Sequence, residues 1–74
     1  MDYTRKQQMA RHWEEIGVPK DRDSFPGVLE QMEIKNNIDL CMLRSIVLDQ
    51  IYELRRQGRD SEKERAFLSW LQER

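Results

Sequence analysis

The feature that most constrains this chain is the apolar run between residues 38 and 54. On a helix of about 3.6 residues per turn, five aliphatic residues of this run fall in one stripe: Leu40, Leu43, Val47, Ile51 and Leu54. Other apolar residues widen the stripe, namely Cys41, Leu48 and Tyr52 on one side and Met42 and Ile46 on the other. The apolar arc then spans about 240° at about 100° per residue, whereas a surface helix needs about 100°. We therefore expect other helices, of this chain or of a second one, to cover this helix from several directions.

Helix start signals predict two further helices before this one. Thr4 and Gln7 have the spacing of a capping box, in which two side chains satisfy free amide groups at a helix start. Gly17 is a stop signal at the other end, so the sequence predicts a helix over residues 5–16. Ser24 is a good N-cap, and the proline two residues later is tolerated in a first helical turn. We expect a second helix over residues 24–35.

The central helix and one more helix fill the second half of the chain. Asn37 is the expected N-cap of the central helix, which should run over residues 38–57 and stop at a glycine. Asp60 or Ser61 then caps a fourth helix, whose apolar residues again recur at helical spacing. The alternation typical of strands does not occur. The sequence predicts one all-α domain over residues 1–74, a small compact bundle of three to four helices around an apolar third helix.

The chain has no obvious disulfide or metal site that could cross-link and stabilise its fold. Seventy-four residues bury a limited core, and such chains usually need a disulfide, a metal, very close packing or a partner. The single cysteine, Cys41, excludes an internal disulfide and should be buried with the apolar arc. One cysteine and one histidine cannot form a structural zinc site. Helix packing or oligomerisation must supply the stability, and we expect a homodimer.

Charge and hydropathy limit the partners. Thirteen basic and fourteen acidic side chains give a net charge of −1, a balance that argues against electrostatic binding to nucleic acid or to membranes. The chain does not begin with the apolar stretch of a signal peptide. No apolar run approaches the roughly 18 residues of a membrane span. We expect a cytoplasmic protein that does not contact membranes.

The residues that usually carry catalysis do not form a set. Glu14 and Glu15 are adjacent, so on a helix they point about 100° apart and cannot share one substrate. His12 has no nucleophile or orienting carboxylate at a suitable spacing. The three glycines are isolated and do not form a phosphate-binding loop. We expect no enzymatic activity, no cofactor and no metal.

The densest basic segment joins the third and fourth helices. It contains Arg55, Arg56, Arg59, Lys63 and Arg65. A helix-turn-helix transcriptional regulator would contact DNA phosphates from such a turn, and this is the alternative function. Three acidic residues interleave with the basic ones, namely Asp60, Glu62 and Glu64. Because carboxylates repel phosphates, we expect no binding to generic duplex, and we assign Arg55, Arg56 and Arg59 to the rim of a protein interface.

Three apolar residues complete the candidate partner-binding set. Met42 and Ile46 lie beside the main stripe, so they either pack in the core or meet a second helix. Trp70 either anchors the core or meets a partner, because aromatic residues are enriched where proteins dock. The function expected is burial of a helix face against another protein. The chain would then be an adaptor, regulator or inhibitor of a larger protein, with the small size of phage or plasmid accessory proteins.

Overall fold

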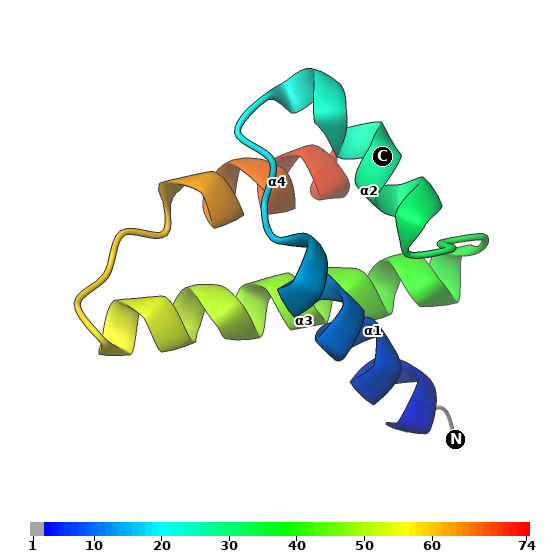
Figure 1. The fold of residues 1–74 in the computed structure, drawn as a ribbon, viewed down its shortest axis with the longest axis horizontal. Coiled ribbons are helices and arrows are strands. Elements are labelled where there is room, and N and C mark those ends of the chain that lie inside the picture. The colour runs from blue at the N-terminus through cyan, green and yellow to red at the C-terminus, as the bar shows by residue number, and fades with distance from the viewer. Residues whose placement is uncertain (1–2) are drawn as a thin grey trace.

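The computed structural model describes residues 3–74 and contains four α-helices (Figure 1). These are α1 (Tyr3–Ile16), α2 (Phe25–Gln31), α3 (Asn37–Arg56) and α4 (Glu62–Gln72), with a short 3₁₀ helix, η1 (Arg22–Ser24), before α2. Within the described residues no strand is present. The predicted all-α bundle with a long third helix is therefore confirmed.

Helix α3 is the longest element, and the other helices pack around it (Figure 1). α4 runs back alongside α3, so the two form an antiparallel hairpin, while α1 crosses α3 obliquely. α2 lies above the N-terminal end of α3, beside the C-terminal end of α4. The radius of gyration is 11.8 Å, close to the roughly 11 Å expected for a compact chain of this length.

All four helices contribute to one hydrophobic core. Its buried residues are Met9, Trp13, Phe25, Val28, Met32, Leu43, Ile46, Val47, Ile51, Phe67, Trp70 and Leu71. Phe67 lies at the centre of an aromatic group, with ring centroids 5.1 Å from Trp13, 5.0 Å from Phe25 and 5.8 Å from Trp70. Stacked and edge-to-face contacts at these separations add to the free energy gained by burying the rings. The aromatic group therefore ties α1, α2 and α4 together.

The two ends of α3 are closed by local hydrogen bonds. The N-cap is Asn36, whose Oδ1 accepts a hydrogen bond from the Asp39 amide at 2.8 Å, so the expected cap at Asn37 is wrong by one residue. At the other end, the Arg59 amide donates to the Leu54 carbonyl at 2.9 Å, and Gly58, with a φ of 71°, occupies the left-handed region. This pattern is a Schellman motif, which satisfies carbonyl groups that a helix end leaves free.

Helix α2 ends at Gln31, four residues before the predicted position 35. Its end is also a Schellman motif: the Ile34 amide donates to the Leu29 carbonyl at 3.0 Å, and Glu33 has a φ of 56°. The turn lets Ile34 pack against the core from outside the helix. The local sequence does not indicate that α2 ends at Gln31. This early end goes together with the partial burial of Ile34. Helix α1 begins earlier than predicted and includes Thr4, which is therefore not its N-cap.

The left-handed Glu33 leads to a stability prediction. A side chain in this conformation costs roughly 1–2 kcal/mol, and glycine avoids this cost but loses more entropy on folding, about 0.5–1 kcal/mol. We expect Glu33→Gly to stabilise the protein by about 0.5–1 kcal/mol, which raises the melting temperature by about 2–8 °C for a domain of this size. Lys35→Gly, at an exposed position with ordinary φ, should lower the melting temperature instead. An equal effect of both substitutions in thermal denaturation would contradict this explanation.

Candidate partner-binding surface

A row of exposed apolar side chains runs along the face of α3 that points away from the core. Ile38 is 65% exposed, Tyr52 is 56% exposed and Leu48 is 39% exposed, and Cys41 is exposed between them. We call these four residues the α3 stripe. Their positions, with Ser45 in the middle, follow the alternating three- and four-residue spacing at which one helix packs along another. The α3 stripe therefore follows one seam of the helix and is divided at Ser45.

The stripe is open because the other helices cover only part of α3. Leu43, Val47 and Ile51 take the core face and are buried. Helix α1 covers the flank that carries Met42 and Ile46, and Lys6 of α1 donates a hydrogen bond to the Ser45 hydroxyl at 3.2 Å. No helix within residues 3–74 covers the flank with Leu48 and Tyr52, so the expectation that Cys41 is buried is wrong.

The structure does not bring the predicted apolar contact residues together on an open surface. Ile46 is 6% exposed and belongs to the core, so of the two alternatives for this residue the core position is correct. Met42 is partly buried against the same core. Trp70 is also buried, and the guanidinium carbon of Arg74 lies 4.5 Å from its ring centroid.

The predicted arginines separate into two groups. Arg56 pairs with Glu53 on the same helix, at 3.3 Å between Nη1 and Oε2. Arg55 and Arg59 instead line a hollow of about 360 Å³ at the turn between α3 and α4. We call it the basic hollow, and its lining residues are Arg55, Arg59, Asp60, Ser61 and Arg65. The third guanidinium of the hollow, from Arg65, was not among the partner-binding residues predicted from the sequence.

The start of α4 contributes Asp60 and Ser61 to the basic hollow. Asp60 Oδ1 accepts a hydrogen bond from the Glu62 amide at 3.1 Å, so Asp60 makes the side-chain bond at this helix start. Ser61 is buried, at 4% exposure, and its hydroxyl does not cap the helix. Ser61 thus lines the hollow together with three arginines.

The α3–α4 hairpin differs from a helix-turn-helix. In that motif two helices meet at about 90–120°, whereas α4 runs back alongside α3 (Figure 1). The acidic residues of the segment are not turned away either, since Asp60 lines the basic hollow and Glu64 lines an adjoining one with Arg59 and Lys63. The arrangement therefore does not present a helix flanked only by positive charge.

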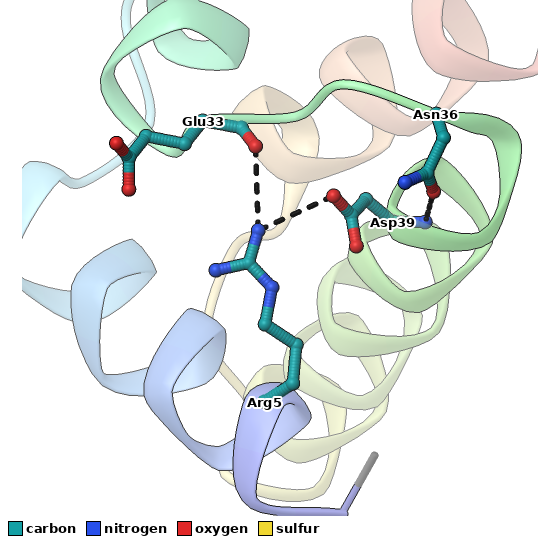
Figure 2. Close-up of polar contacts among 4 residues, drawn as sticks. All are labelled: Arg5, Glu33, Asn36 and Asp39. Atoms are coloured by element: carbon teal, nitrogen blue, oxygen red, sulfur yellow. Dashed lines mark hydrogen bonds and ion pairs between the residues drawn. The ribbon is translucent and has the colours of Figure 1, made fainter. Parts of the chain in front are cut away.

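A polar cluster at the N-terminal end of α3 joins three segments of the chain (Figure 2). Arg5 of α1 donates from Nη2 to the Glu33 carbonyl at 3.3 Å and to Asp39 Oδ2 at 3.2 Å. Asp39 in turn donates its amide to Asn36. Figure 2 shows Arg5 reaching from α1 to the end of α2 and the start of α3. Because all its members are used in these contacts, the cluster braces the fold, and sequence reasoning missed it because Arg5 and Asp39 are 34 residues apart.

A second hollow, of about 390 Å³, lies between α1 and α3. Ala10, Trp13 and Ile46 form its apolar part, and the carboxylates of Glu14 and Asp49 are among its polar lining. The indole Nε1 of Trp13 is used in a hydrogen bond to Gln50. The hollow is open to solvent and does not include the α3 stripe, and none of its buried polar side-chain atoms lacks a hydrogen-bond partner.

Chemistry-bearing residues do not converge elsewhere in residues 3–74. In this part of the chain there is no group of three or more His, Cys, Asp or Glu residues that could hold a metal ion. His12 is half-buried on α1, and both glutamates that follow Trp13 are exposed. No helix among the described residues has the length and apolar character needed to span a membrane.

No protein-family model matches the chain, and neither a curated protein nor a solved structure matches it.

Proposed function

We propose that this protein is a non-enzymatic protein–protein interaction module of the cytoplasm, which acts as an adaptor, regulator or inhibitor of a larger protein. The observation that carries the proposal is the α3 stripe, with Ile38 and Tyr52 more than half exposed. Exposed apolar patches larger than isolated side chains are typical of docking sites. Binding of a partner would remove the stripe from water.

The shape of the stripe favours a helix as the docking element. Residues that alternate at three and four positions form the seam along which a second helix packs, with its side chains fitting between those of the first. Ser45 lies midway and is half-buried because its hydroxyl accepts a hydrogen bond from Lys6 of α1, so the apolar contacts of a partner helix would lie on either side of it. Tyrosine adds a large contact area with a polar end, which suits a surface that is wet before binding.

The homodimer expected from the sequence would use this seam, because Ile46 is in the core of its own chain. Four side chains give less than the roughly 800 Å² per partner of a stable interface, so the dimer should be weak. We expect light scattering to show a mass that rises with concentration from 9.0 kDa towards about 18 kDa, twice the chain mass. A mass of 9.0 kDa at every concentration would exclude the homodimer.

The protein-binding proposal itself is tested with a stripe variant that should keep its fold. In Ile38→Asp/Tyr52→Gln, the aspartate lies in the first turn of α3, where the helix dipole favours it. The glutamine removes the exposed ring, is a good helix former and adds no charge next to Arg55 of the basic hollow. Ser69→Asp, on the exposed side of α4, adds a charge away from the stripe and is the control.

Quantitative affinity purification from the cells that produce the protein compares the three forms. We expect the wild type and Ser69→Asp to retain the same larger protein, and the double variant to lose it while its melting temperature is unchanged. Retention of that protein by the double variant would rule out the α3 stripe as its docking site.

A further inference from the structure

We infer that the basic hollow binds a phosphate monoester carried by a side chain of the partner protein. The inference rests on the proposed function in that it takes the partner to be a protein. It adds a second contact, at the turn between α3 and α4, with different chemistry from the apolar α3 stripe.

Three guanidinium groups of the hollow are free to bind an anion. The ion pairs within residues 3–74 join Arg5 to Asp39, Arg22 to Glu73 and Arg56 to Glu53. None of them uses the arginines at positions 55, 59 and 65. A guanidinium presents parallel N–H groups that match two oxygens of a phosphate, and such charge-assisted bonds are about twice as strong as neutral ones. The Schellman turn at Gly58 fixes the backbone from which Arg59 extends.

The charge of the hollow matches one phosphate monoester. Three arginines and Asp60 sum to 3 − 1 = +2. A phosphorylated side chain carries about −1.5 to −2 at pH 7, whereas a carboxylate carries −1 and would leave the hollow positive. The balance therefore favours a phosphate over a glutamate or aspartate of the partner.

Ser61 adds a hydroxyl-bearing residue to the lining of the hollow. The residue is 4% exposed and its side chain does not cap α4, so its hydroxyl is a further donor for a phosphate oxygen. The N-terminal end of α4, which borders the same space, also favours an anion.

The surroundings favour a single anion over a nucleic-acid backbone. In the adjoining hollow Glu64 offsets Lys63, and Asp60 again contributes a carboxylate. Glu62 is exposed in the first turn of α4, and the whole chain has a net charge of −1. A polyanion that extended beyond the hollow would meet these carboxylates, whereas one phosphate on a flexible peptide would not.

The test is an NMR titration of the full chain at constant ionic strength. The probes are inorganic phosphate, a short peptide with one phosphoserine, the same peptide without phosphate, and a short DNA duplex. Arg59→Ala removes one guanidinium but keeps the backbone N–H of the turn. Arg56→Ala removes an arginine that pairs with Glu53 outside the hollow, so it is the matched control.

We expect inorganic phosphate and the phosphopeptide to shift the amide signals of residues 58–65 saturably, and the unmodified peptide to leave them unchanged. Arg59→Ala should weaken phosphopeptide binding at least about tenfold, equivalent to about 1.4 kcal/mol, while Arg56→Ala keeps the wild-type affinity. Absence of saturable shifts, or equal weakening by both variants, would overturn the inference. Tighter, steeply salt-dependent binding of the duplex would overturn it in favour of nucleic acid.

The phosphate titration and the stripe experiment test two different sites, so either proposal can be contradicted without the other. If phosphate does not bind but the double stripe variant still loses the partner, the phosphate site is wrong and the protein-binding proposal stands. If phosphopeptide binds but no partner depends on the α3 stripe, the docking surface is wrong and the phosphate site stands as a separate property of the fold.

Discussion

Phe67→Ala is expected to destabilise the protein by about 3–5 kcal/mol, the usual cost of removing a buried aromatic ring. Phe67 is completely buried, and its ring contacts Trp13, Phe25 and Trp70, so the cavity would lie where α1, α2 and α4 meet. A chain of 74 residues has a total stability of roughly 4–11 kcal/mol at about 0.05–0.15 kcal/mol per residue. The variant should therefore be largely or partly unfolded at room temperature, as circular dichroism and urea denaturation would show.

Phe67→Leu is the matched control for that experiment. Leucine fills much of the space of the ring and keeps the site apolar, so the loss of stability should be clearly smaller than for alanine. If both variants had the melting temperature of the wild type, Phe67 would not lie at the centre of the core, and the packing of α4 described above would be wrong.

Ile51→Ala should cost about 2–5 kcal/mol, and Leu48→Ala on the same helix should cost much less. Ile51 is buried on the core face of α3, while Leu48 is 39% exposed on the α3 stripe. The two side chains have the same number of carbon atoms, so the difference in the free energy of unfolding reports which face of α3 the core covers. Equal losses in urea denaturation would show that the helix is rotated from the orientation described here, or that Leu48 is buried by a second chain.

The helices and the core face of α3 were accessible from the sequence, because both depend on local pattern. The stripe that contains Val47 and Ile51 follows the helical repeat, and those residues are buried as expected. The end of α2 was not accessible in this way. Nothing in the local sequence requires Glu33 to adopt a positive φ, and the turn is accompanied by the packing of Ile34 against distant parts of the core.

The open face of α3 also could not be predicted from the sequence alone. In the sequence, both flanks of α3 carry apolar residues, with Met42 and Ile46 on one side and Cys41, Leu48 and Tyr52 on the other. Helix α1 packs on the first flank and leaves the second exposed, and this choice depends on contacts between segments some 40 residues apart. The sequence could therefore indicate that α3 has more apolar surface than one face requires, but not which flank stays open.

The basic hollow was visible from the sequence only in part. The arginines at positions 55, 56 and 59 stood out as a dense segment, but their spacing does not show that one of them turns to Glu53 and the others face Arg65. That separation depends on the hairpin between α3 and α4. Ser61 also lines the hollow, while Asp60 makes the side-chain bond to the α4 start.

The most direct test of the central claim, that the α3 stripe binds another protein, is photo-crosslinking in the living cell. A photoreactive phenylalanine analogue at position 52 lies on the stripe, and the same analogue at position 69 lies on the exposed side of α4. Illumination should join position 52, and not position 69, to one defined protein band, which mass spectrometry then identifies. Equal crosslinking from both positions, or none from position 52, would contradict the claim that this face of α3 is the docking surface.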